Sequence, residues 1–263
     1  MTAGILIGAL LALATALPLA WKWELGMGRS LGGLIAFAAI AAGIAVLLDL
    51  GGAVTAALVW ALTVGLAVAV VLWRFYRDPE RTAPPGEEAI VSPADGVVIY
   101  VKGSEGGEIP VSAKVGRRYP LEELTRTELQ SEEAVVIGIA LSFLDVHVNR
   151  APIAGRVSVQ RHFAGRFGSL KDPEAVVCNE RSTTVIENSR LQAAVVLIAS
   201  RLVRRIVTYV QANDEVALGE RIGVIRFGSQ VDLVLPARTE LEVLVEPGQR
   251  VRAGESIVAE LST

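Results

Sequence analysis

The sequence has few of the residues that form the commonest reactive and metal-binding sites. Its 263 residues include one cysteine, Cys178, and two histidines, His147 and His162. A single cysteine excludes an internal disulfide and a cysteine-based metal cluster, and we predict no metal cofactor. The formal net charge of −3 provides none of the basic excess that a nucleic-acid-binding surface needs. We therefore predict no nucleic-acid partner.

Charge is also scarce in the first 73 residues, which hold most of the apolar excess of a chain that is 52% hydrophobic. Three apolar runs, 3–20, 31–48 and 53–73, are each close to the length that a helix needs to cross a bilayer. A signal peptide is the alternative for the first run, but no basic residue precedes it, and Trp21-Lys22-Trp23 is typical of a membrane interface. We predict a membrane anchor of three transmembrane helices within residues 1–80.

The positive charges beside these runs predict the orientation of the anchor. Lys22 and Arg29 lie between the first and second runs, and further arginines, including Arg74, follow the third. The positive-inside rule places both groups on the cytoplasmic side. We expect residues 81–263 to form one domain at the cytoplasmic face of the cell membrane. Small residues of the second run, Gly32, Gly33, Ala36 and Gly43, would allow close helix packing.

From Ala89 onward the chain consists of short β-branched segments separated by turns, which predicts a mainly-β domain. The glycine and valine spacing of 245–255 is like that of a hairpin in lipoyl- and biotinyl-type barrels, so we expect a barrel-sandwich portion. A carrier of that type needs a lysine at the hairpin tip. The last lysine is Lys171, and carrier chemistry is therefore excluded.

The most informative stretch is Phe227-Gly-Ser229. The small Gly228 leaves its carbonyl open to the hydroxyl of Ser229, an order of residues that favours self-cleavage. The same tripeptide occurs at Phe167-Gly-Ser169, but there a turn follows, whereas Ser229 opens an alternating apolar strand. We interpret Ser169 as a loop residue. His147 is either the base that activates a serine or a structural residue, and Asp95, before a glycine, is by itself an ordinary turn residue.

Three motifs in this order resemble the phosphatidylserine decarboxylase proenzymes, in their short membrane-associated bacterial and archaeal form. They are Ser92-Pro-Ala-Asp-Gly96, Leu144-Asp-Val-His-Val-Asn-Arg-Ala-Pro-Ile-Ala-Gly155, and Phe227-Gly-Ser229 with the strand that follows it. The resemblance implies self-cleavage between Gly228 and Ser229 into chains 1–228 and 229–263. It also implies a pyruvoyl group made from Ser229, used without pyridoxal phosphate or a metal, and a triad in which Asp95 orients His147 and His147 activates Ser229.

The implied reaction converts phosphatidylserine in the membrane to phosphatidylethanolamine. Arg166 and Lys171 are candidate contacts for the lipid phosphate, and a homodimer is left open. The chain departs from the family pattern in two places. Larger members have a second histidine where Arg150 stands, which leaves open whether His147 serves both cleavage and decarboxylation. Gln230 stands where many members have threonine.

Three alternatives remain. The substrate could be the ether lipid archaetidylserine, which presents the same headgroup. The chain could be a non-catalytic, membrane-tethered, carrier-like β domain. It could also be a serine hydrolase that uses the same side chains, although it lacks the Gly-x-Ser-x-Gly elbow. The second and third alternatives both predict an uncleaved chain.

Overall fold

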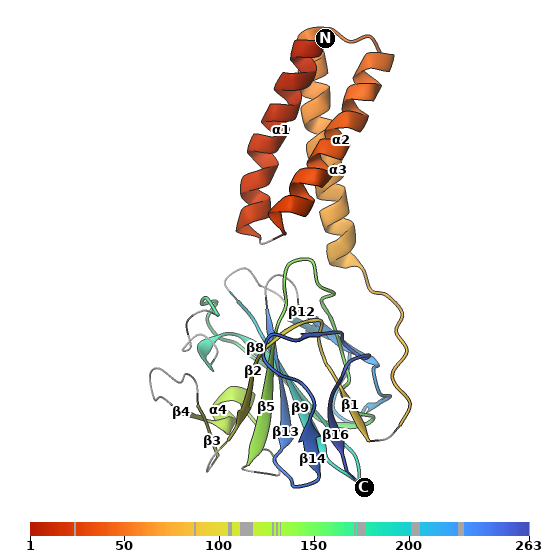
Figure 1. Cartoon of the computed structure of the whole chain (residues 1–263). Helices are drawn as coiled ribbons and strands as arrows, with labels where there is room; N and C mark the ends of the chain where they lie inside the picture. Colours follow the sequence, from red (N-terminus) through yellow and green to blue (C-terminus); the bar gives the residue numbers. More distant parts are fainter. Residues whose placement is uncertain are drawn as a thin grey trace. The chain divides into compact units, whose positions relative to one another are not determined.

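The computed structural model of the chain (Figure 1) divides into two compact units, Met1–Arg77 and Asp78–Thr263. It describes residues 1–23, 25–86, 88–104, 107–110, 118–127, 129, 131, 133–170, 172, 177–200, 206–225 and 229–262.

The first unit consists of three apolar helices: α1 (Thr2–Lys22), α2 (Met27–Leu47) and α3 (Gly52–Tyr76). Within the described residues these are the 3 helices long and apolar enough to cross a membrane, which confirms the predicted apolar helices. Helices α1 and α3 extend beyond both ends of the uncharged runs that predicted them, whereas α2 begins before its run and ends one residue short of it. A helix satisfies its own backbone hydrogen bonds, so it can continue past the apolar run through basic residues such as Lys22 and Arg74, which lie in the last turns of α1 and α3.

Glycines of α1, rather than those of α2, allow the closest helix contact. A Cβ added at Gly4 would overlap the carbonyl oxygen of Gly52 in α3, and one added at Gly8 would lie 2.8 Å from the Cβ of Val59. A Cβ at Gly32, Gly33 or Gly43 would meet no described atom within 4 Å. The prediction that these α2 glycines permit close packing is therefore wrong. Which helix faces meet depends on how the helices pair, and periodicity alone does not determine that.

The second unit is mainly β, as predicted. Its strands form an 8-stranded sheet in the order β11-β7-β8-β9-β13-β5-β2-β15, two 3-stranded sheets, β1-β16-β14 and β10-β12-β6, and the pair β3-β4. The elements are β1 (Ala89–Val91), β2 (Gly96–Gly103), β3 (Glu108–Pro110), β4 (Arg118–Pro120), α4 (Leu121–Thr125), β5 (Ala134–Ala140), β6 (Val148–Arg150), β7 (Gly155–Phe163), β8 (Arg181–Glu187), β9 (Gln192–Ile198), β10 (Ile206–Thr208), β11 (Glu215–Val216), β12 (Arg221–Ile225), β13 (Gln230–Pro236), β14 (Leu241–Val243), β15 (Arg250–Val251) and β16 (Ile257–Leu261).

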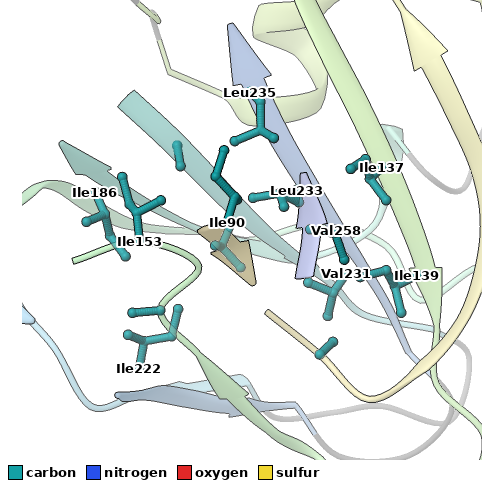
Figure 2. Close-up of a cluster of buried hydrophobic side chains, with 14 of the residues drawn as sticks. Ile90, Ile137, Ile139, Ile153, Ile186, Ile222, Val231, Leu233, Leu235 and Val258 are labelled. Atoms are coloured by element: carbon teal, nitrogen blue, oxygen red, sulfur yellow. The ribbon is translucent and has the colours of Figure 1, made fainter. Parts of the chain in front are cut away.

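The main hydrophobic core is formed by one face of the 8-stranded sheet together with both 3-stranded sheets. Figure 2 shows the buried side chains that these sheets contribute, among them Leu233 of β13, Ile137 of β5, Ile222 of β12 and Val258 of β16. A smaller cluster on the other face packs under Leu121 and neighbouring residues of α4. The finer likeness to a lipoyl-type barrel remains a prediction.

Strand register brings distant segments together at one end of the 8-stranded sheet. Gln230, the first residue of β13, pairs with Ala140 at the end of β5 and with Ile198 at the end of β9. Ala140 also pairs with Val97 at the start of β2. We call the end of the sheet marked by Val97, Ala140, Ile198 and Gln230 the site end.

Candidate active site

Ser229 lies at the site end, directly before β13. Its carbonyl oxygen accepts a hydrogen bond of 3.0 Å from the N–H of Leu141, so the backbone is fixed just ahead of the strand. The side chain is buried, with the residue 2% exposed, and its Oγ has no hydrogen-bond partner among the described residues. A buried hydroxyl without a partner is uncommon and marks a candidate reactive group. Gly228, the other residue of the predicted cleavage site, lies outside the described residues.

His147 is buried directly before β6. Its carbonyl oxygen accepts a 3.1 Å hydrogen bond from the N–H of Ile225, the last residue of β12, which is the strand that leads toward Ser229. The next residue, Val148, packs with Val224 in a separate small cluster. Successive side chains of a strand point to opposite faces, so His147 lies on the same side as Ile225, toward the main core. The backbone thus places the predicted base next to Ile225, which precedes Ser229 by four positions in the sequence.

Asp95 lies directly before β2. The next residue, Gly96, passes so close to Ala140 that a Cβ at position 96 would overlap the Ala140 carbonyl oxygen. Among the described residues, its carboxylate is bound by Arg81 and by a backbone N–H. Arg81 Nη1 donates to Oδ1 at 2.5 Å, Arg81 Nη2 donates to Oδ2 at 2.9 Å, and the N–H of Ala253 donates to Oδ1 at 2.8 Å. A role for Asp95 in orienting His147 therefore remains a prediction.

The turn that carries Asp95 also contacts the strand that follows His147. The carbonyl oxygen of Pro93 accepts a 2.9 Å hydrogen bond from the N–H of Arg150 and a 3.4 Å hydrogen bond from the side-chain amide of Asn149. Two of the three motifs thus meet through their backbones. Sequence reasoning did not identify Arg81 as the partner of Asp95, because their contact depends on tertiary structure.

A short segment after α3 is fixed to this domain by two further arginines. Arg221 donates to Asp78 at 2.6 Å and to Glu80 at 2.8 Å, and the hydrogen bond from Arg221 lowers the pKa of Glu80. Arg150, which stands at the place of the family's second histidine, is buried and donates to the carbonyl oxygens of Pro79 at 3.0 Å and of Gly219 at 2.8 Å. Burial lowers the pKa of Arg150. In this position Arg150 links segments of the fold.

The remaining candidates lie apart from these contacts. Ser169 is exposed in a turn where its carbonyl oxygen accepts a 2.9 Å hydrogen bond from Asp172 N–H, which confirms its interpretation as a loop residue. Arg166 is also exposed, while Lys171 lies outside the described residues. The side chain of His162 is half-exposed, and its Nε2 lies 3.4 Å from Oε1 of Glu180. Among the described residues, no group of three or more histidine, cysteine, aspartate or glutamate side chains could hold a metal ion.

Sequence reasoning missed a buried polar cluster on the face of β13 that points away from the main core. Gln230 and Asp232 lie on this face, and both contact the hydroxyl of Tyr100 on β2. The signal was present in the sequence. A glutamine and an aspartate alternate with valine and leucine in a strand whose other members are apolar, and a central strand buries polar side chains only with partners.

The fold and these buried groups define a β domain that follows three apolar helices and has a serine hydroxyl buried directly before a central strand. The family model for phosphatidylserine decarboxylase matches residues 68–259. The chain is 39% identical over 204 residues to the phosphatidylserine decarboxylase proenzyme of Nocardia farcinica, covering 77% of this chain and 78% of that protein. It is 38% identical over 209 residues to the phosphatidylserine decarboxylase proenzyme of Geobacter sulfurreducens, and the match covers 77% of this chain and 84% of that protein.

A third relative, from Methanothermobacter thermautotrophicus, is named "Putative archaetidylserine decarboxylase proenzyme". It is 40% identical over 192 residues, covering 73% of this chain and 81% of the relative. The chain belongs to the phosphatidylserine decarboxylase family. This membership confirms the resemblance drawn from the three motifs and identifies the chain as a decarboxylase of the proenzyme type.

Proposed function

We propose that this chain cleaves itself between Gly228 and Ser229 and then removes the carboxyl group of phosphatidylserine, giving phosphatidylethanolamine. The observation that carries the proposal is the Ser229 hydroxyl. It is buried, lies directly before a central strand, and lacks a hydrogen-bond partner among the described residues. In a family of proenzymes, such a hydroxyl is a suitable nucleophile for the neighbouring carbonyl.

The proposed cleavage begins when His147 takes the proton of the Ser229 hydroxyl. The serine oxygen then attacks the carbonyl carbon of Gly228, the amide nitrogen leaves with a proton, and the peptide bond becomes an ester. A base then removes the Cα proton of residue 229, and the Cβ–O bond breaks, which releases the Gly228 carboxylate and leaves dehydroalanine. Hydrolysis of the resulting dehydroalanine gives ammonia and a pyruvoyl group at the start of chain 229–263. Histidine suits the proton transfer because its pKa is ordinarily near neutrality.

The surroundings of Ser229 fit a pyruvoyl group. The group is small and uncharged, which suits the buried position of residue 229, where the serine hydroxyl has no hydrogen-bond partner among the described residues. Once formed, it would supply an electron sink for decarboxylation. His147 would exchange the proton at the reacting carbon, and Asp95 is the proposed orienting carboxylate. Arg166 and Lys171 remain proposed contacts for the lipid phosphate.

A second candidate substrate is archaetidylserine, favoured by the name of the Methanothermobacter relative. Both lipids present the same serine headgroup, and they differ in the linkage and structure of their chains. We also propose that the enzyme lies in the cell membrane with its β domain on the cytoplasmic side, as the arginines after α3 predict. A homodimer remains an open proposal, to be tested by mass measurement in detergent.

The test is decarboxylation by the purified full chain in detergent, with ester-linked and ether-linked serine lipids supplied in parallel. We expect release of carbon dioxide and formation of the matching ethanolamine lipid, and loss of both in Ser229→Ala. Ser169→Ala is the matched control and should keep full activity. Wild-type protein that decarboxylates neither lipid would contradict the proposal.

A further inference from the structure

The strand that follows Ser229 has two buried faces of opposite character. Val231, Leu233 and Leu235 enter the main core. Gln230 and Asp232 alternate with them on the other face and are 2% and 0% exposed. Polar side chains that are completely buried in a central strand require hydrogen-bond partners. The first of them immediately follows the residue that is proposed to react.

The two side chains form a closed hydrogen-bonded triangle with Tyr100. The amide nitrogen of Gln230 donates to the Tyr100 oxygen at 2.7 Å and to Asp232 Oδ1 at 2.7 Å. The Tyr100 hydroxyl donates to Asp232 Oδ2 at 2.7 Å. The amide has two hydrogens and the phenol has one, so every donor of the triangle has an acceptor within it. The conformation of Gln230 is thereby fixed.

A glycine makes this triangle possible. Gly138 of β5 pairs with Asp232 on one side and with Tyr100 on the other. A Cβ added to Gly138 would overlap the ring of Tyr100. The ring therefore lies across β5 in the space that a side chain would fill, and its hydroxyl reaches β13. Three neighbouring strands thus contribute to the triangle.

The charge of Asp232 makes the arrangement costly. Burial raises the pKa of Asp232 to about 6, although hydrogen bonds from Gln230 and Tyr100 and the positive charges of Arg181 and Lys102 lower it. Buried charged groups are weak contributors to stability, and apolar residues of similar volume often serve as well or better. Stability alone is therefore a poor explanation for a carboxylate at this position.

We propose that Gln230, held by Tyr100 and Asp232, is a positioning residue for residue 229. In the proenzyme it would hold the Ser229 hydroxyl in place for attack. After cleavage it would fix the new end of chain 229–263, because chain ends fray unless they are tied down. The backbone of Gln230 pairs on both sides, with Ala140 and Ile198, so residue 230 is fixed both through its main chain and through its side chain. This inference rests on the proposed function.

The test compares Tyr100→Phe and Gln230→Leu with Thr183→Val in the full chain. Thr183 is a matched control because it is completely buried and donates a 2.6 Å hydrogen bond to the Thr125 carbonyl oxygen. It pairs with Val196, which pairs with Asp232 on its other side, so Thr183 and Asp232 lie at the same level of the sheet. Cleavage is followed by intact mass after synthesis in a cell-free system, and stability by thermal unfolding. Small displacements at a reacting group can reduce rates about 100-fold.

We expect Tyr100→Phe and Gln230→Leu to cleave at least about tenfold more slowly than Thr183→Val at a comparable loss of thermal stability. In the cleaved fraction, kcat should fall with little change in KM, whereas Thr183→Val should leave both near the wild-type values. Cleavage rates within about twofold of the Thr183→Val rate would overturn the inference. Uncleaved wild-type protein would instead contradict the proposed function, so the two failures are distinguishable.

Discussion

The ion pair between Arg81 and Asp95 provides the sharpest test of how the segment after α3 supports the site. Its side chains are 5% and 11% exposed, so solvent screens the pair weakly. Burial lowers the pKa of Arg81, but the hydrogen bond and charge of Asp95 outweigh it and raise the pKa overall. Replacing Arg81 by glutamine would leave the Asp95 carboxylate buried with the N–H of Ala253 as its remaining described partner.

Loss of one partner of a buried ion pair destabilises a protein by about 3–5 kcal/mol. We expect Arg81→Gln to cost about 3 kcal/mol, the lower end of this range, because the Ala253 hydrogen bond remains. The assay is urea unfolding of the full chain in detergent on a Ser229→Ala background, so that every sample carries the same unbroken chain. Arg221→Ala is the control, since its pairs are more exposed to solvent and should contribute much less to stability than the buried pair.

A double-mutant cycle isolates the contact itself. If Arg81 stabilises the fold through Asp95, Arg81→Gln combined with Asp95→Asn should be less destabilising than the sum of the single changes, by at least about 2 kcal/mol. Additivity within about 0.5 kcal/mol would refute the reasoning. The Arg81→Gln and Asp95→Asn changes, made again in the chain that keeps Ser229, separate effects on stability from effects on cleavage. If Asp95 also orients His147, Asp95→Asn should slow cleavage far more than its effect on stability explains.

Three further predictions concern single groups. His147→Ala should slow self-cleavage by at least about 100-fold, the range of acid–base catalysis, with little change in thermal unfolding; cleavage near the wild-type rate would exclude it as the base. For Asp232 the folded pKa of about 6 lies above the ordinary 3.8, so its contribution to stability is fully present below pH 4 and is lost as the pH rises through 6. The stability of Asp232→Asn relative to wild type should therefore increase by roughly 2 kcal/mol between pH 4 and pH 6 in urea unfolding, and a constant difference would contradict the assignment. Gly138→Ala should displace Tyr100 and slow cleavage as Tyr100→Phe does, measured by intact mass; an unchanged rate would show that the ring does not need that space.

The sequence predicted the features that depend on local pattern. Long apolar runs predicted three helices, and alternating β-branched segments predicted the mainly-β domain. The context after each Phe-Gly-Ser tripeptide also separated Ser229, before a central strand, from Ser169, in an exposed turn. These features could be predicted because each is determined by neighbouring residues.

Features that depend on strand register or helix pairing could not be predicted in the same way. The pairing of Arg81 with Asp95 and Ala253 joins segments brought together by the fold. The path of Tyr100 across Gly138 depends on the alignment of β2 with β5. The polar pattern of β13 was visible in the sequence, but its partner on β2 was not.

The most direct test of the central claim is the intact mass of the purified chain beside Ser229→Ala and Ser169→Ala. The account predicts two fragments in the wild type and in Ser169→Ala, 1–228 and 229–263, the smaller with a pyruvoyl group at its first residue. It predicts a whole chain in Ser229→Ala. A single uncut wild-type chain, or cleavage that persists in Ser229→Ala, would contradict it.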